Sequence, residues 1–570
     1  MKMTKEFEEN RSNIDALADK ALDSIVAPHA LLDISVWHLL TVAEDQVRMI
    51  FAGWIEIDEK AFFHIVDGFK YSLKHSITHV YKKSIHEKIT LPQKTIPDAY
   101  KKAALLLAAS EKYESISRLI ASTYNQRGTF VKVNDGYKLE NSEFVDIRYS
   151  VLEGLGHGAD PTPDITGVLH YWLTNNSSLE EERLIASSIY DSVRLSKGRV
   201  TYYYQGQVAY EVSRRIPQRD KIIPDEFSFS WGKDYKTHAL INSLLIRCFY
   251  HVLAIEIAAR KFGIKGGAES SLLLIVTKQQ LCADIQELAD FADKEVYEFI
   301  NMLTYGRNTK TPDIALQPLF LSKSGFFMIP CYQVLNTNIQ RNLLTLLAKI
   351  NPNNFDSQSS LFEKDMTSKI ENSLNEWKYK NLNKEFKFGE KKEEIDGFIL
   401  DEINKTILLM ELRWILQPGD AREVYNKIKS VLSKVDQLSR KIDFVKDNFS
   451  EIIVRSFGDH IDISQPSEWK VKGVVLIQGY AGTSSPQEDI PIVTVDVFCK
   501  GIKQFKDLHA FYVWIKCLIW LPVEGEHFDV EAIIEDNDFV QVSRTVAKVL
   551  VNQRQYTESL QKSILDHLAK

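Results

Sequence analysis

Two apolar segments separated by a short polar turn constrain the fold of this chain more than any other feature. Residues 393–414 read EEIDGFILDEINKTILLMELRW, with four polar turn residues near the middle. If Asp401 pairs with Thr406 across that turn, Asp396 lies opposite Glu411, with their Cβ atoms roughly 5 Å apart. The sequence therefore predicts a β-hairpin that brings two carboxylates together.

The charged residues of this hairpin suggest a cation site. Strand alternation places Glu411 and Arg413 on one face. Two carboxylates this close repel each other in an apolar setting unless a cation lies between them. Mg²⁺ suits the position because it takes hard oxygen ligands and keeps coordination positions for phosphate oxygens. The pattern thus indicates metal-dependent phosphodiester chemistry, although two ordinary buried strands with solvent-facing charges would also produce it.

The segments around the hairpin predict an ordered set of helices and strands. A helix within residues 361–377 has an apolar stripe that consists of Phe362, Met366, Ile370, Leu374 and Trp377. A strand at 384–388 precedes the hairpin. A long helix follows it, opened by Asp420 with Glu423 three residues later as a capping box. Strands at 471–477 and 492–498 complete an α-β-β-β-α-β order.

In this order, Asp396 and Glu411-x-Arg413 resemble the core of the PD-(D/E)XK nuclease superfamily, which has the restriction-endonuclease-like fold. Glu363 resembles the acidic residue that is often found on the first core helix of that family. The resemblance covers about residues 355–525. It implies that Glu363, Asp396 and Glu411 hold Mg²⁺ or Mn²⁺, and that Asp396, Glu411 and Arg413 are catalytic in DNA hydrolysis, with RNA not excluded.

The chain departs from the family pattern at Arg413, where the family usually has lysine. Arginine can orient water and contact a phosphate bidentately, but it cannot act as a base. Lys391 and Lys392 are candidate replacements for the missing lysine. Gln437 and Lys441 on the long helix partly match the Gln-x-x-x-Tyr motif of RecB-like nucleases, with lysine in place of tyrosine.

A local basic patch is the candidate nucleic-acid surface. Lys387, Lys391 and Lys392 lie beside the proposed site, among aromatic residues. The formal net charge of the whole chain is −7, which excludes a generally basic nucleic-acid-binding protein but still permits such a patch. The alternative is a solvated helix end and an exposed edge strand.

Length and composition limit the remaining possibilities. The 570 residues are too many for one core and imply several domains. The five cysteines show no metal-site spacing, which favours reduced thiols and a cytoplasmic location. We expect no membrane association, because there is no signal-peptide core and no uncharged apolar run approaches the ~20 residues that span a bilayer.

Overall, the sequence predicts a multidomain α+β protein. Residues 1–350 form a mostly helical region with a recognition, partner or oligomerisation role, and residues 355–570 form the α/β nuclease-like domain, with a mixed central sheet and C-terminal helices. The helical region should contain two hairpins, with turns at Asp135-Gly136 and around Gly206, and two short strands within 315–335. Long helices are expected over 236–262 and 268–306, and the second stretch contains a helix pair at 278–291 and 293–305 that has helix-turn-helix length. An Asn/Pro/Ser cluster at 351–360 predicts the linker.

Two functions remain open at this point. The first is a metal-dependent nuclease, which the resemblance places in a bacterial restriction or phage-defence system, acting as a homo-oligomer or with a partner protein. The second is a catalytically degenerate nuclease fold that serves as a nucleic-acid-binding or protein-interaction scaffold. In the second case, the arginine at position 413 would be the substitution that accompanies the loss of catalytic activity.

Overall fold

The computed structural model describes residues 5–51, 59–124, 128–133, 136–141, 146–157, 180–214, 221–264, 268–288, 290–388, 390–418, 421–480, 490–537 and 540–568. The chain is a mixture of helices and mixed sheets. It divides into two compact units, each assembled from separate stretches of sequence. Unit 1 comprises residues 1–13, 118–160 and 359–570, and unit 2 comprises residues 14–117 and 161–358.

This division differs from the predicted one in two ways. The first 350 residues do not form one region, because residues 1–13 and 118–160 group with the C-terminal part. The expected linker is a helix, α14 (Pro352–Gln358), whose Gln358 side chain accepts a hydrogen bond from the Ser228 backbone N–H at 2.7 Å. The change of unit occurs directly after this helix.

The main sheet of unit 1 has the strand order β10-β11-β12-β13-β14. Its strands are β10 (Tyr379–Phe388), β11 (Lys391–Asp401), β12 (Thr406–Trp414), β13 (Lys470–Gln478) and β14 (Ile492–Thr494). The first three are antiparallel, whereas β12, β13 and β14 are parallel to one another. The sheet is therefore mixed, as predicted.

Helices pack on both faces of this sheet. On one face, Leu408, Met410 and Leu412 of β12 belong to a core with α15 (Ser360–Ser373) and α19 (Leu508–Lys516). On the other face, Ile407 and Leu409 belong to a core with α16 (Ala421–Asp447) and α17 (Phe449–Phe457). The buried residues of α15 include Phe362, Met366 and Ile370, as the predicted stripe required.

Two details of this region differ from the sequence predictions. The strand predicted over 492–498 ends at Thr494, whose side chain accepts a hydrogen bond from the Val497 N–H and caps helix α18 (Val495–Ile502). An N-capping threonine therefore prevails over the β-propensity of the residues that follow it. The predicted cap of α16, Asp420, lies outside the described residues.

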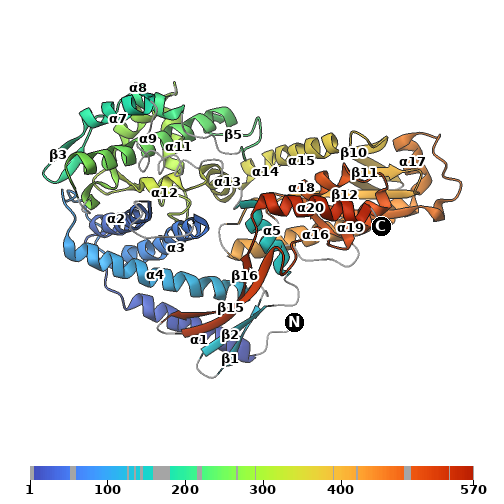
Figure 1. The fold of residues 1–570 in the computed structure, drawn as a ribbon, viewed down its shortest axis with the longest axis horizontal. Helices are drawn as coiled ribbons and strands as arrows, with labels where there is room; N and C mark the ends of the chain where they lie inside the picture. The colour runs from blue at the N-terminus through green and yellow to red at the C-terminus, as the bar shows by residue number, and fades with distance from the viewer. Residues whose placement is uncertain are drawn as a thin grey trace. The chain divides into compact units, whose positions relative to one another are not determined.

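A second sheet in unit 1 joins distant parts of the sequence. Its strand order is β1-β2-β16-β15, built from β1 (Gly128–Val133), β2 (Gly136–Asn141), β15 (Phe528–Asn537) and β16 (Val540–Val549). Strand β2 pairs in parallel with β16, so the red C-terminal hairpin lies beside the first hairpin (Figure 1). Helices α5 (Ile147–His157) and α20 (Gln553–Leu568) contribute Val151, Leu155 and Tyr556 to the core beneath this sheet.

Unit 2 is mostly helical. Its helices are α2 (Leu32–Phe51), α3 (Glu59–Lys83), α7 (Glu180–Ser192), α8 (Gly206–Ser213), α9 (Asp234–Lys261), α10 (Lys278–Gln286), α11 (Asp293–Met302), α12 (Cys331–Leu335), α13 (Ile339–Ile350) and α14. A three-stranded sheet has the order β7-β9-β8, formed by β7 (Leu274–Thr277), β9 (Phe326–Ile329) and β8 (Phe320–Leu321). Helices α1 (Lys5–Asp23) and α4 (Pro97–Tyr124) run through both units.

Two predictions for this part of the chain are wrong. The second hairpin turns at Lys197 and Gly198, between β3 (Arg194–Ser196) and β4 (Arg199–Thr201), because these two residues adopt the positive φ angles of 51° and 82° that a tight turn needs. Gly206 instead begins α8. The helical stretch predicted over 268–306 is interrupted by β7, which pairs with β9. The helix pair predicted within it at 278–291 and 293–305 is present as the shorter helices α10 and α11.

Buried polar contacts hold unit 2 together. On α9, His251 and Arg247 both contact the Tyr202 hydroxyl, at 2.7 Å and 2.9 Å, and Arg247 also pairs with Asp284 at 2.5 Å. Burial lowers the pKa of His251 to about 3. Among the described helices, α9 alone is long and apolar enough to cross a membrane, but 83% of its most apolar window is buried inside the protein.

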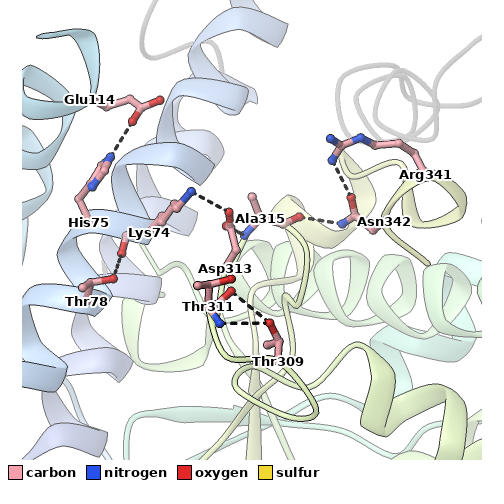
Figure 2. A network of polar contacts seen from close by, with 10 residues as sticks. All are labelled: Lys74, His75, Thr78, Glu114, Thr309, Thr311, Asp313, Ala315, Arg341 and Asn342. Atoms are coloured by element: carbon pink, nitrogen blue, oxygen red, sulfur yellow. Dashed lines mark hydrogen bonds and ion pairs between the residues drawn. The ribbon is translucent and has the colours of Figure 1, made fainter. Parts of the chain in front are cut away.

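A second network ties a loop of unit 2 to two helices (Figure 2). The Asp313 carboxylate pairs with Lys74 of α3 at 3.0 Å and accepts a hydrogen bond from the Ala315 N–H at 2.9 Å. The Ala315 carbonyl in turn accepts a hydrogen bond from Asn342 of α13 at 2.7 Å. The loop that precedes β8 is thereby fixed at both sides.

Candidate active site

The predicted hairpin forms with the expected register. Asp401 pairs with Thr406, and the ladder between β11 and β12 continues to Gly397 and Met410. It ends there, one step before Asp396 and Glu411. The Asp396 carboxylate accepts a hydrogen bond from the Leu412 N–H at 2.8 Å. At this point a side-chain oxygen of β11 therefore binds the N–H of β12 that a backbone carbonyl would bind in a continuing ladder.

The backbone at Asp396 is also outside the ladder on its other side. The pairing of β10 with β11 passes from Leu382–Gly397 to Lys384–Ile395 and omits Asn383, which has a φ of 54°. The register is the same on both sides of the omitted pair, so no extra residue is inserted and the interruption affects Asn383 and Asp396 alone. Because the ladder between β11 and β12 also ends at Gly397, β11 leaves β12 at Asp396, where the sequence places the first carboxylate.

Two lysines of α16 neutralise the second carboxylate. Glu411 is 1% exposed, and its two oxygens lie 2.6 Å from the Lys434 ammonium and 2.5 Å from the Lys441 ammonium. Lys441 also lies 3.7 Å from Asp396. The cation between the two predicted carboxylates is therefore a lysine in this structure.

Close packing of α16 on the sheet positions both lysines. Lys434 and Lys441 are seven residues apart, which places them on one face of the helix. Leu438, between them, is buried against the sheet. Gly473 of β13 permits this approach, because a Cβ there would lie 2.7 Å from Ile442 and 3.0 Å from Leu438. A side chain at this position would therefore force these residues of α16 to shift.

Glu363 lies in the electric field of the same cluster. Burial raises its pKa, the charges of Lys434 and Arg413 lower it, and those of Asp396 and Glu411 raise it. Its neighbour Phe362 stacks on Trp414, with ring centroids 3.7 Å apart and planes inclined by 20°. This stack fixes the start of α15 at the end of β12.

Arg413 is a cation without a carboxylate partner among the described residues. Its side chain is half-buried, and its Nε atom is buried without a hydrogen-bond partner. It follows Glu411 on the same face of β12. Because Lys434 and Lys441 are both engaged by Glu411, Arg413 is the cation of this cluster that is available to an added anion.

The structure does not bring the predicted nucleic-acid-binding lysines into this cluster. Lys387, Lys391 and Lys392 are exposed on the β10–β11 hairpin, and Lys392 pairs with Glu385 at 2.7 Å. The hairpin segment 384–394 contains four lysines and four glutamates, the latter at 385, 390, 393 and 394. The positive charge of the predicted patch is thus offset locally.

Lys434 is the member of the cluster that the sequence prediction missed. The sequence feature that could have indicated Lys434 is its position seven residues before Lys441. Lys441 itself entered the sequence analysis only through its partial match to the Gln-x-x-x-Tyr motif. Glu363, Asp396 and Glu411 face three cations, Lys434, Lys441 and Arg413, so the formal charges balance. Throughout the described ranges, no group of three or more His, Cys, Asp and Glu side chains is arranged to hold a metal ion.

Comparisons with known proteins give no match: no family model fits the chain, and no curated protein or solved structure is significantly similar to it. Any conclusion about activity must therefore come from the cluster itself. This cluster combines two adjacent carboxylates where β11 leaves β12, two lysines that neutralise one of them, and an arginine that has no carboxylate partner among the described residues. Groups of this kind bind phosphate esters and divalent cations.

Proposed function

We propose that unit 1 is a PD-(D/E)XK-type nuclease that hydrolyses phosphodiester bonds of DNA with Mg²⁺ or Mn²⁺, within a restriction-endonuclease-like fold. The observation that carries the proposal is the convergence of Asp396 and Glu411 at the point where β11 leaves β12. That convergence is combined with the order α15-β10-β11-β12-α16-β13. A phosphodiester anion would meet Arg413 beside these carboxylates.

The donor set suits a hard divalent cation. Asp396 and Glu411 supply carboxylate oxygens, and the 1% exposed Glu411 already requires positive charge beside it. Asp396 and Glu411 would hold the ion, which would replace one of the lysines at Glu411. Glu363 would have to move toward them to join, because the three described carboxylates are not arranged as a metal site. When bound, such an ion activates water and neutralises charge on the scissile phosphate.

The protein groups have separable roles in this proposal. Lys441 contacts both carboxylates and keeps them together, supplying the ammonium that the strand position of Arg413 does not. Arg413 holds a phosphate oxygen and so positions the phosphorus for attack by water. Hydrolysis adds water across one P–O bond, and its proton ends on the departing oxygen.

A second candidate is a binding-only scaffold with the same fold. It is favoured by the balanced charges and by the two lysines that occupy both oxygens of Glu411. In either case unit 2 would recognise a target or a partner protein. The setting that we propose is bacterial restriction or phage defence in the cytoplasm.

The test compares cleavage by the full chain with cleavage by carboxylate variants. Plasmid, linear duplex, single-stranded DNA and RNA are incubated with the protein in Mg²⁺, in Mn²⁺ and in EDTA. We expect metal-dependent cleavage that Asp396→Asn and Glu411→Gln abolish. Asp443→Asn, at a 73% exposed position on α16, should retain it. Metal-dependent cleavage that survives Asp396→Asn would exclude this site, and no cleavage of any substrate would favour the scaffold.

A further inference from the structure

The two lysines that share Glu411 differ in how firmly they are held. Lys441 is 8% exposed and lies within 4 Å of both carboxylates. Lys434 is 17% exposed, and among the described residues its ion pair is with one oxygen of Glu411, at 2.6 Å. Lys441 would have to leave direct contacts with two carboxylates. Lys434 would have to leave one direct contact, with Glu411, and the longer-range attraction of Glu363, and it is the more exposed of the two lysines. Lys434 is therefore the exchangeable cation of the pair.

This arrangement sets a condition on metal binding. Both oxygens of Glu411 are occupied by ammonium groups, and the formal charges of the whole cluster already balance. A divalent ion that binds beside the two lysines makes the cluster strongly positive, which costs free energy in a partly buried site. An ion that displaces Lys434 reduces the repulsion at Glu411, where only the Lys441 ammonium then remains. The metal ion then binds to Glu411 as the Lys434 ammonium leaves it.

We propose that Lys434 is a built-in competitor of the metal ion, and that on displacement it moves from Glu411 to a phosphate of the nucleic acid. This inference rests on the proposed function, since it concerns the same metal and the same substrate. A phosphate oxygen gives the displaced ammonium a new anionic partner beside Arg413. The metal ion consequently binds weakly to the free protein and more tightly once a nucleic-acid backbone is present.

The two ligands are thereby coupled through one side chain. Because coupling between two ligands is reciprocal, the metal ion must also strengthen nucleic-acid binding by the same factor. The consequence is a protein that loads its metal mainly on its substrate. A metal-loaded protein without substrate would be a minor species.

The first arm of the test measures Mn²⁺ binding without nucleic acid, by titration calorimetry and by electron paramagnetic resonance of free Mn²⁺. Lys434→Met removes the competitor and keeps the length of the side chain. We expect the dissociation constant for Mn²⁺ to fall at least about tenfold. Lys446→Met, at a 54% exposed position on the same helix, removes the same charge and should leave the constant unchanged. Glu411→Gln added to Lys434→Met should reverse the gain.

The second arm adds phosphorothioate oligonucleotides, single-stranded and double-stranded, which resist cleavage. In the unsubstituted protein they should tighten Mn²⁺ binding at least about fivefold. In Lys434→Met this coupling should become clearly weaker, because only the direct attraction between the ion and the phosphate remains. Equal Mn²⁺ affinity in the unsubstituted protein and in Lys434→Met would overturn the inference, as would tight binding that persists after Glu411→Gln. Circular dichroism of each variant verifies that it is folded.

The binding assay separates this inference from the proposed function. The expected Mn²⁺ shifts without cleavage of any substrate would support the competitor role of Lys434 and contradict the nuclease. Cleavage that requires Asp396, together with unchanged Mn²⁺ affinity in Lys434→Met, would support the nuclease and contradict the competitor role.

Discussion

Replacing Lys441 with methionine tests whether the two carboxylates depend on this lysine for stability. Glu411 is 1% exposed, and Lys441 lies 2.5 Å from one of its oxygens, so the substitution leaves a buried carboxylate with half of its compensation. Breaking a buried ion pair costs about 3–5 kcal/mol, and we expect the lower end, about 3 kcal/mol, because Lys434 remains beside Glu411. Asp396 loses its nearest cation as well.

The assay is urea denaturation of the full chain, with hydrogen exchange of peptides from β12 and α16 to assign the loss to unit 1. Lys446→Met is the matched control on the same helix, and it should change the free energy of unfolding by less than about 0.5 kcal/mol. Adding Glu411→Gln to Lys441→Met should recover much of the loss, because the uncompensated charge is then absent. A cost below about 1 kcal/mol for Lys441→Met, or no recovery in the double variant, would refute the reasoning.

Three further predictions concern other parts of the molecule. Arg413→Ala should lower cleavage about 100-fold or more while the melting temperature stays level, and Arg413→Lys should retain activity; unchanged turnover of the alanine variant would exclude the phosphate contact. Gly473→Val should push α16 away from the sheet and cost about 1–3 kcal/mol or more in urea denaturation, and a neutral result would contradict the close contact with Ile442. Because burial lowers the pKa of His251 to about 3, the unfolded chain binds a proton on this side chain at a higher pH than the folded chain does. The stabilisation is therefore complete above about pH 6.5. Between about pH 6.5 and about pH 3, the free energy of unfolding falls by about 1.4 kcal/mol for each unit by which the pH is lowered. Thermal melts of unsubstituted protein and His251→Gln between pH 7 and pH 4 should show a shallower loss in the variant.

Local sequence patterns predicted the part of the site that local structure determines. The turn between Asp401 and Thr406 fixes the register of the hairpin, and this register brings Asp396 next to Glu411. Along α16, apolar residues recur every three or four positions, at Val431, Val435, Leu438, Ile442 and Val445, and this spacing indicates which face of that helix packs on the sheet. These patterns depend on neighbours that are close along the chain.

The contacts made across the sheet could not be predicted in the same way. Which lysines of α16 reach Glu411 depends on how far the helix slides along the sheet, which Gly473 and Leu438 determine together. The pairing of Tyr137 in β2 with Val542 in β16 has no signal in either strand alone. The helix α8 was missed because Gly206 resembles a turn residue, although the turn lies at Gly198.

The pairing of β2 with β16 has a consequence for synthesis of the protein. The partner of Tyr137 is Val542, which leaves the ribosome about 400 residues later, roughly 20–80 s at ordinary elongation rates. During that time the first hairpin exists as a two-stranded ribbon, which is marginal in water by itself. One edge of β2 stays open until the last strand arrives. Nascent chains that stall or end before residue 540 therefore expose this edge, and they are the forms of the protein that we expect chaperones and proteases to recognise.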